Sequence, residues 1–360
     1  MAKILIKGNE AIGEAAIKAG CRYFFGYPIT PQSELPEYLA KRLHEVGGTF
    51  LQAESEISAI NMVYGAAGAG ARVMTSSSSP GISLKQEGIS YIAGAELPCL
   101  IINVMRGGPG LGSIQPAQSD YYQATKGGGH GDYRLIVLAP NSVQEMIDLT
   151  IKGFTLADKY NTPVMLLADG VIGQMMEPVE LPDDVDVLPE KPWATTGKGE
   201  RKRNIINSLY MDPVECEQHN IKLREKYDKI AQQEVMYESY FTEDAELVLV
   251  AYGASSRIAQ GVIDEGRNAG LKLGLFRPIT LWPYPSEELS KAASNAKALL
   301  CVEMSSLGQM VEDVKLAVHC QKPVYFFGRS GGIVPTLEEV YEKCQELIKG
   351  RGIVHEICPA

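Results

Sequence analysis

The sequence predicts an α/β protein built from two parallel-sheet domains. At 360 residues, the chain is longer than one hydrophobic core usually supports, so two domains are expected. Short apolar runs alternate with amphipathic stretches over residues 1–180 and again over residues 245–350. This alternation is typical of strands that alternate with helices. Apolar strands in that setting predict a parallel sheet that is covered by helices on both faces.

The first domain is predicted over residues 1–180. It begins with a short strand inside Met1–Gly8, whose apolar run of three residues is too short for a signal peptide. The further strands expected are Cys21–Phe25, Arg72–Thr75, Cys99–Met105, Leu135–Leu138 and Pro163–Leu167. The helices expected are Glu10–Ala19, Ser33–Val46, Ser55–Ala67, Ile82–Ala93 and Ser142–Lys159. Ser142 followed by Glu145 predicts a capping box at the start of the last helix.

Residues 181–244 interrupt this pattern. A segment rich in proline and acidic residues leads into a polar stretch, Glu215–Tyr240, with weak helical periodicity. It is interpreted either as a linker with a helical arm that docks on a partner, or as a plain linker. The second domain follows over residues 245–360. Its expected strands are Glu246–Ala251, Leu271–Phe276, Lys297–Val302 and Pro323–Phe327, and its expected helices are Ser255–Ala269, Ser286–Ala293, Gly308–Val318 and Thr336–Ile348.

Composition argues against several classes of function. The net charge is −10 without a long basic run, which argues against a nucleic-acid partner or an anionic membrane surface. No apolar stretch reaches the roughly 20 residues that span a bilayer, so a cytoplasmic location is expected. The seven cysteines form no CxxC pair, and the five histidines show no metal-ligand spacing. We therefore expect reduced thiols, and neither a metal site nor an iron–sulfur cluster in this chain.

Candidate site residues lie in the loops after the first-domain strands, where open parallel sheets bind their ligands. Residues 26–31 (Gly-Tyr-Pro-Ile-Thr-Pro) place the hydroxyl of Thr30 between two prolines, although a rigid turn before a helix would look the same. Four serines, residues 76–79, could cradle an anion or could be polar filler. Arg106 opens a glycine-rich loop and suits a carboxylate clamp, with a surface ion pair as the alternative. His130, in the loop 126–132, is either an acid/base group or part of a hinge.

Glu56 is the remaining candidate. On a helical wheel it falls among Ile60, Val63 and Ala67, whereas Glu54 falls on the polar side. A carboxylate on an apolar face is costly unless it has a partner. The alternative is that Glu56 starts the helix and is stabilised by free amides and the helix dipole. A carboxylate in apolar surroundings together with a carboxylate clamp suits thiamin chemistry on a 2-oxo acid.

Three motifs in register carry a resemblance that covers nearly the whole chain. They are Gly-Tyr-Pro-Ile-Thr-Pro at 26–31, Gln-Ala-Glu-Ser-Glu at 52–56 and Asn-Val-Met-Arg-Gly-Gly-Pro at 103–109. The chain resembles the 2-oxoacid:ferredoxin oxidoreductase family, in the subunit that carries the pyrimidine-binding domain of thiamin diphosphate. The second domain also matches, at 276–283 (Phe-Arg-Pro-Ile-Thr-Leu-Trp-Pro) and at 302–304. The resemblance therefore implies a pyrimidine-type fold followed by a transketolase C-terminal-like domain.

The resemblance implies a role for each candidate residue. Glu56 matches the glutamate that hydrogen-bonds N1′ of the aminopyrimidine, and Tyr27, Pro28 and Ile29 line the same cofactor. Thr30 matches the threonine that contacts the substrate, and Arg106 matches the arginine that holds the substrate carboxylate. The family's reaction releases CO₂, passes electrons to iron–sulfur clusters and transfers the acyl group to coenzyme A. Residues 329–332 are a candidate coenzyme A loop, although a turn between domains is the better expectation.

The expected substrate class follows from one difference between this sequence and the 2-oxoglutarate members of the family. The chain reads Ile-Gln-Pro-Ala at 114–117, where many 2-oxoglutarate enzymes have Leu-Pro-Thr-Lys, so no lysine meets a second carboxylate. The loops 110–116 and 126–132 resemble those of 2-ketoisovalerate members instead. The resemblance therefore implies oxidative decarboxylation of a branched-chain 2-oxo acid, with 2-oxoglutarate or indolepyruvate as alternatives.

The chain is expected to act with partners. It shows no Gly-Asp-Gly…Asn run for the Mg²⁺ and diphosphate end of thiamin, and no cysteine cluster. The resemblance implies a diphosphate-binding subunit, a gamma-type subunit, an iron–sulfur subunit and an external ferredoxin. Two rivals remain, which are a non-catalytic scaffold subunit and a transketolase-like enzyme complete in one chain. The missing diphosphate motif argues against the second.

Overall fold

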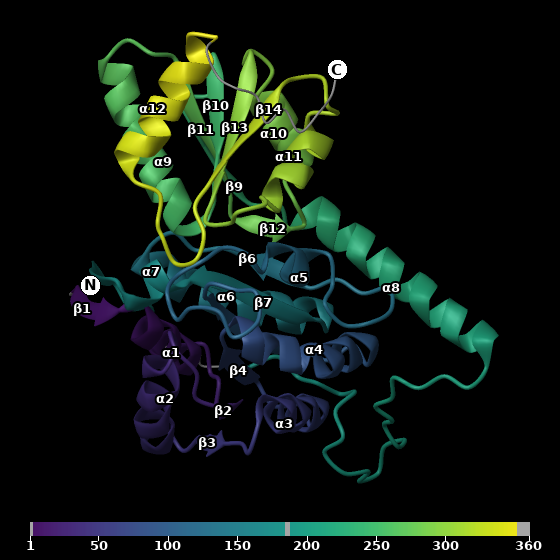
Figure 1. Ribbon diagram of the computed structural model, residues 1–360. Coiled ribbons are helices and arrows are strands. Elements are labelled where there is room, and N and C mark those ends of the chain that lie inside the picture. The colour runs from purple at the N-terminus through teal and green to yellow at the C-terminus, as the bar shows by residue number, and fades with distance from the viewer. Residues whose placement is uncertain (1–2, 184–187, 351–360) are drawn as a thin grey trace.

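The computed structural model describes residues 3–183 and 188–350 and stacks two largely parallel sheets (Figure 1). The larger sheet has seven strands in the order β12-β6-β7-β5-β4-β2-β3, and β12 alone runs antiparallel to its neighbour. The strands are β2 (Tyr23–Gly26), β3 (Thr49–Gln52), β4 (Val73–Ser77), β5 (Cys99–Met105), β6 (Ile136–Leu138), β7 (Pro163–Asp169) and β12 (Thr280–Trp282). The central strands β5 and β7 are buried along their whole length and form the middle of the core.

Helices cover this sheet, as continuous apolar strands require. They are α1 (Gly8–Lys18), α2 (Glu34–Glu45), α3 (Glu56–Gly68), α4 (Ser79–Gly94), α5 (Tyr121–Thr125), α6 (Val143–Tyr160) and α7 (Gly170–Gln174). The Oγ of Ser142 caps α6 by accepting the N–H of Glu145. The predicted capping box is wrong in its second half, because the Glu145 carboxylate accepts the N–H of Asn141 and pairs with Arg277 instead.

The second sheet has five strands in the order β14-β13-β10-β11-β9, with β9 antiparallel at one edge. They are β9 (Tyr237–Tyr240), β10 (Leu247–Val250), β11 (Leu273–Pro278), β13 (Ala298–Glu303) and β14 (Val324–Gly328). The helices α9 (Gly253–Asn268), α10 (Ser286–Ala292), α11 (Met310–Ala317) and α12 (Leu337–Ile348) pack around it. The expected residues 351–360 of this domain lie outside the described part of the chain.

The segment between the sheets docks on its own chain. Residues 184–187 lie outside the described residues, and residues 188–212 run over the first domain, where Thr195 N–H donates to the carbonyl of Gly68. Helix α8 (Pro213–Gln233) buries Leu223, Tyr227 and Ile230 against that domain. The helical periodicity predicted through Tyr240 ends at Gln233, because the following residues form the edge strand β9.

Buried polar contacts join the two sheets. The amide of Gln118 is fully buried, donates to the carbonyl of Tyr252 at 2.8 Å and accepts from Ser255 and Met304. Arg277 forms a double hydrogen bond to Glu145 at 2.6 and 2.7 Å. After β14, the chain reaches down to the first domain, where Gly332 packs so closely on Gln115 that an added Cβ would lie 2.2 Å from its side chain. Residues 329–332 are thus a contact between the sheets.

The predicted strands and helices occur with ends shifted by a few residues at most. Strand β1 (Ile4–Lys7) also forms, but it pairs with β8 (Met176–Val179) in a separate two-stranded ribbon. The short strands β3, β8, β9 and β12 and the one-turn helices α5 and α7 were not predicted, because three to five residues carry too little periodicity. No helix in the described ranges is long and apolar enough to cross a membrane.

Candidate active site

Glu56 is the first residue of α3. Strand β3 ends at Gln52, and the Oγ of Ser55 caps the helix by accepting the N–H of Ser58. The Glu56 side chain is 7% exposed, whereas its neighbour Ile57 is 49% exposed. Among the described residues, no donor is hydrogen-bonded to the Glu56 carboxylate, so the free amides of the helix do not bind it. Glu54 is exposed and accepts the hydroxyl of Ser58.

The start of α4 lies directly against Glu56. A Cβ added to Gly81 would lie 2.7 Å from Glu56 Oε1 and 2.0 Å from Ser77 Oγ. Glycine is therefore required at position 81 for the carboxylate and the serine to share this space. The hydroxyls of Ser77 and Ser78 are buried, and neither has a partner among the described residues. Buried polar atoms are normally paired, so these two hydroxyls are free to accept or donate a hydrogen bond at the start of α4.

Arg106 follows β5 on the other side of α4. Its Nη1 donates to the carbonyl of Thr30 at 3.0 Å, and its Nη2 donates to the carbonyl of Leu111 at 3.0 Å. The side chain is buried, and its Nε has no partner among the described residues. Carbonyl oxygens leave the guanidinium charge uncompensated. The alternative of a surface ion pair does not fit this buried side chain, whereas a carboxylate would supply both the missing charge and an acceptor.

Ser79 ties Arg106 to the start of α4. Its Oγ accepts the N–H of Arg106 at 3.0 Å and lies 2.6 Å from Asp120, which also accepts from Asn103. Burial raises the pKa of the Asp120 carboxyl, and the two hydrogen bonds partly offset that shift. The sequence analysis did not identify Asp120 because it lies in an irregular segment. The fixed position of Arg106 depends on this network.

The other predicted residues fall in two places. Tyr27, Pro28 and Thr30 are exposed and Ile29 is half-buried, in the loop between β2 and α2 that Arg106 reaches. His130 is not part of this arrangement. It lies over the second half of α4, edge-on to Tyr91 and 3.4 Å from Ser90 Oγ. The structure thus brings Thr30, Glu56 and Arg106 around the N-terminus of α4 and leaves His130 elsewhere.

Lys85 was missed by sequence reasoning. Its side chain is fully buried, and its Nζ donates to the main-chain carbonyl of Glu56 at 3.4 Å. A signal was available, because Lys85 stands three residues after Ile82 and four before Ile89, on the buried face of α4. A charge in the apolar stripe of a helix is as unusual there as in the case of Glu56.

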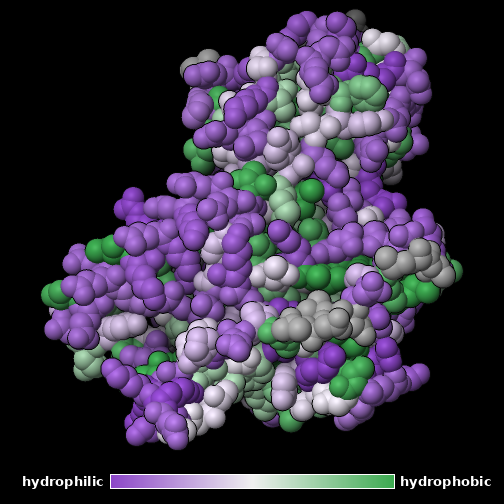
Figure 2. All heavy atoms as spheres, turned by 180° about the vertical axis from the view of Figure 1, so that it is seen from behind, coloured by the Kyte–Doolittle hydropathy of each residue, from purple (hydrophilic) through white to green (hydrophobic). Residues whose placement is uncertain are grey.

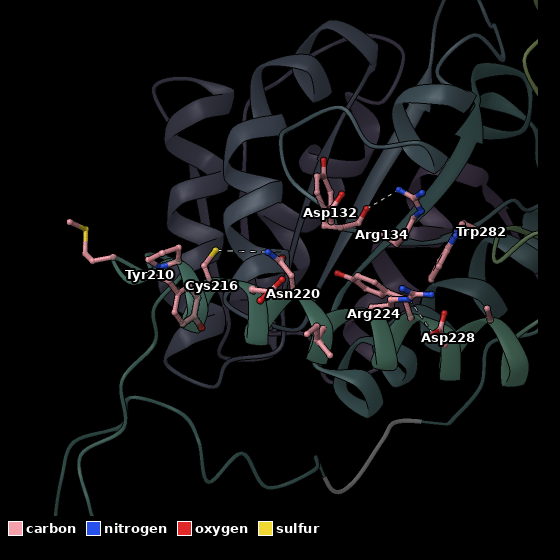
Figure 3. Close-up of a pocket in the computed structure, with 15 residues that line it drawn as sticks. Asp132, Arg134, Tyr210, Cys216, Asn220, Arg224, Asp228 and Trp282 are labelled. Carbon is pink, nitrogen blue, oxygen red and sulfur yellow. Dashed lines mark hydrogen bonds and ion pairs between the residues drawn. The ribbon is translucent and has the colours of Figure 1, made fainter.

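A wide cleft lies away from these residues. It measures about 990 Å³ and runs along α8 from Tyr210 and Cys216 to Trp282, with Arg134 and Asp132 on its far wall (Figure 3). It contains none of the predicted site residues. In the described part of the chain, no group of three or more histidine, cysteine, aspartate or glutamate side chains could hold a metal ion.

Comparison with known proteins places this geometry in a family. Residues 14–239 match the family described as pyruvate flavodoxin/ferredoxin oxidoreductase, thiamine diphosphate-binding. Residues 245–340 match pyruvate:ferredoxin oxidoreductase core domain II. The chain belongs to the pyruvate flavodoxin/ferredoxin oxidoreductase family. The resemblance drawn from the three motifs is confirmed, and the first domain is a thiamin diphosphate-binding domain.

Individual relatives agree over the full length. The chain is 53% identical to ketoisovalerate oxidoreductase subunit VorB of Methanothermobacter marburgensis, covering 96% of this chain and 98% of that protein. It is 36% identical to 2-oxoglutarate synthase subunit KorA of the same organism, over 94% of this chain and 97% of that one.

Solved structures show the same fold. A 2-oxoglutarate:ferredoxin oxidoreductase from Magnetococcus marinus, with 2-oxoglutarate, coenzyme A and succinyl-CoA bound, superposes with a TM-score of 0.87 at 27% identity. The match covers 96% of this chain and 65% of that one, so this chain spans about two thirds of its length. A split-gene transketolase shares the fold alone, with a TM-score of 0.60 at 14% identity, over 96% of this chain and 98% of that one. The predicted fold class is confirmed.

Proposed function

We propose that this chain is the thiamin-binding subunit of a complex that oxidatively decarboxylates a branched-chain 2-oxo acid, 2-ketoisovalerate, to its acyl-CoA with reduction of ferredoxin. The observation that carries the proposal is the arrangement around the N-terminus of α4. There the buried Glu56 carboxylate lies close to Ser77 Oγ, and the buried Arg106 guanidinium lies at the same helix end. Within the described residues, the carboxylate, this hydroxyl and the Arg106 Nε–H have no hydrogen-bond partner. The high identity to a ketoisovalerate oxidoreductase subunit supports the choice of substrate.

These residues fit the pyrimidine end of thiamin diphosphate. Bound thiamin diphosphate would supply the electron sink that allows a 2-oxo acid to lose CO₂. Glu56 would hold a proton at N1′ of the pyrimidine, since its carboxylate is buried and free to accept one hydrogen bond. Tyr27, Pro28 and Ile29 would line the ring from the loop after β2. In the described ranges, no cluster of ligands would hold the Mg²⁺ and diphosphate end.

Arg106 would bind the substrate carboxylate. Two of its N–H groups are anchored on the carbonyls of Thr30 and Leu111, which fixes the plane of the guanidinium before the substrate arrives. Preorganisation of this kind reduces the entropy lost on binding. Thr30 is exposed next to Arg106, where its hydroxyl would contact the substrate.

The loop that anchors Arg106 carries the specificity. Leu111 and Ile114 are 81% and 56% exposed, and Gln115 and Pro116 lie opposite Gly107 and Arg106. In the described part of this loop no cation is available to meet a second carboxylate. An apolar substrate side chain therefore suits this loop, and a dicarboxylate would leave a charge unpaired.

Partner subunits would complete the site. Seen from behind, more hydrophobic patches appear on the larger domain and at the junction than on the second domain (Figure 2). Exposed apolar side chains, including Tyr27, Ile57 and Leu111, surround Glu56 and Arg106. In the proposed complex, these are covered by the diphosphate-binding subunit. A gamma-type subunit, an iron–sulfur subunit and a ferredoxin would complete electron transfer in the cytoplasm, where the free cysteines stay reduced.

The test is the substrate preference of the assembled complex. Coenzyme A-dependent reduction of ferredoxin would be measured with 2-ketoisovalerate, 2-oxoglutarate and indolepyruvate. We expect kcat/KM for 2-ketoisovalerate to exceed that for 2-oxoglutarate by about 100-fold, which is the cost of an unpaired buried carboxylate. Preferred turnover of 2-oxoglutarate or indolepyruvate would reject the branched-chain assignment.

A further inference from the structure

Lys85 is a buried charge that the proposed function leaves unexplained. It lies in the middle of α4, it is 0% exposed, and it is among the largest fully buried side chains of the molecule. An ammonium group has three donors, and within the described residues Lys85 makes one long hydrogen bond, of 3.4 Å, to the main-chain carbonyl of Glu56. Burial of a lysine at this cost requires a compensating negative charge.

Helices α3 and α4 cross closely, and this crossing places Lys85 near Glu56. Gly81, Lys85 and Gly88 follow each other at spacings of four and three residues, so they lie on one face of α4. An added Cβ at Gly81 would lie 2.7 Å from Glu56 Oε1, and one at Gly88 would lie 2.5 Å from Ile60 Cγ2. The two glycines thus bring the helices close together, and the lysine side chain lies between them at the level of Glu56.

Glu56 is the charged group that acts on Lys85. Burial lowers the pKa of Lys85 to about 8, and the negative charge of Glu56 opposes that shift. The other titratable groups near α4 face different residues. Asp120 contacts Ser79, Tyr133 contacts Gln86, and His130 and His219 contact Ser90 and the carbonyl of Gly94. With a pKa of about 8, Lys85 is still mostly protonated at neutral pH.

We propose that Lys85 is a positioning residue whose ammonium group binds the main-chain carbonyl of Glu56, serves as the counter-charge of the Glu56 carboxylate, and fixes the start of α3 against α4. Without Lys85, the Glu56 carboxylate is a buried charge with no neighbouring cation, which raises the free energy of that charge. The carboxylate is then a weaker partner for the proton that it would hold at N1′ of the pyrimidine. This inference rests on the role of Glu56 in the proposed function.

The test uses the assembled complex with thiamin diphosphate. The near-ultraviolet circular dichroism of the imino tautomer of bound thiamin, and the Kd of thiamin diphosphate, would be followed against pH. In Lys85→Met, which preserves volume, we expect the pH at which the signal is half lost to rise by about one unit, equivalent to a tenfold change in proton affinity. Lys85→Arg keeps the charge and should keep the midpoint. Lys41→Met, the same change at an exposed position on α2, is the matched control.

A double mutant keeps the proposal testable if Lys85→Met does not assemble. Glu56→Gln/Lys85→Met removes both charges and should assemble, because no lone buried charge remains. Failure of the double mutant as well, or an unchanged midpoint in Lys85→Met, overturns the role of Lys85. If Glu56→Gln alone retains the full circular dichroism signal, the role of Glu56 in the proposed function fails instead.

Discussion

Two buried glutamates show what separates a structural carboxylate from a candidate catalytic one. Glu303 ends β13 in the second sheet and is 0% exposed, and Glu56 starts α3 beside the first sheet and is 7% exposed. The Glu303 carboxylate accepts the N–H groups of Gln309, Met310 and Val311 at 3.0–3.2 Å. Burial raises the pKa of Glu303, and these hydrogen bonds offset only part of that shift.

Glu56 receives no such bonds from the described residues. Its carboxylate lies against Gly81 and close to Ser77 Oγ, which has no hydrogen-bond partner among the described residues, and Lys85 binds its main-chain carbonyl. Glu303 therefore holds the start of α11 to β13, while Glu56 keeps an acceptor free. The comparison teaches that burial alone does not indicate catalysis, because the informative feature is a buried polar group whose hydrogen bonds are left open.

Exchange of each glutamate for glutamine should separate the two roles most strongly. Glu56→Gln should lower kcat of the assembled complex by about 10²–10⁴, because the amide cannot hold the proton at N1′. It should also lower the free energy of unfolding by about 1–3 kcal/mol, because buried Lys85 loses its counter-charge. Glu303→Gln should lower that free energy by about 2 kcal/mol, because three N–H groups lose a charged acceptor. Turnover assays and chemical denaturation of both variants check this pair. Near-normal turnover of Glu56→Gln would favour a scaffold subunit.

The pH dependence of the free energy of unfolding should show whether Lys85 is a buried cation. The pKa of Lys85 is lowered to about 8 in the folded chain, against 10.5 for a free lysine. Between these values the unfolded chain binds more protons, so the free energy of unfolding of the wild type should rise with pH relative to Lys85→Met. The rise should total about 3 kcal/mol. Denaturation of both proteins below pH 8 and above pH 10 measures it. A constant difference would show that Lys85 has an ordinary proton affinity.

Replacement of Arg106 tests the proposed binding of the substrate carboxylate by its guanidinium. Arg106→Lys keeps the charge but loses the fork that binds the carbonyls of Thr30 and Leu111 and the substrate carboxylate together. We expect kcat/KM to fall by about 30-fold, equivalent to about 2 kcal/mol. The loss should be similar for every monocarboxylate tested. A loss confined to one substrate would place Arg106 at the substrate side chain instead.

The smallest expected effect concerns Gly81, which makes room for the Glu56 carboxylate at the start of α4. Gly81→Ala would place a methyl group 2.7 Å from Glu56 Oε1, so the carboxylate must move, and kcat should fall by about tenfold. Gly65→Ala in α3 is the matched control, because an added Cβ there meets no atom within 4 Å. It should stabilise α3 by up to about 1 kcal/mol. Equal turnover of the two variants would contradict a tight fit of Glu56 against α4.

The long elements, and the unusual placement of Glu56 and Arg106, could be predicted from the sequence for physical reasons. Apolar strands such as β5 and β7 and helices such as α6 have enough residues to show their period. Glu56 was visible as a charge on an apolar face, and Arg106 as a cation at a strand end. Strands β3 and β12 are too short to show an alternating pattern in the sequence. In addition, β12 pairs with a strand more than 140 residues away in the sequence.

Contacts between distant segments could not be predicted. The pairing of Gln118 with the second sheet, the network of Asp120 and the approach of α3 to α4 depend on how the layers stack. Lys85 was recognisable in principle, because it occupies the same kind of position as Glu56. Its proximity to Glu56 depends on the crossing of α3 and α4 at Gly81 and Gly88, which no local pattern indicates.

The central claim is that Glu56 keeps its acceptor free for the pyrimidine of thiamin diphosphate. The most direct measurement is an experimental structure of the assembled complex with the cofactor bound. The account predicts a Glu56 carboxylate oxygen within about 3 Å of N1′, the length of an ordinary hydrogen bond, with the contacts of Glu303 unchanged. A pyrimidine ring bound elsewhere, or a Glu56 carboxylate paired with main-chain amides as Glu303 is, would contradict it.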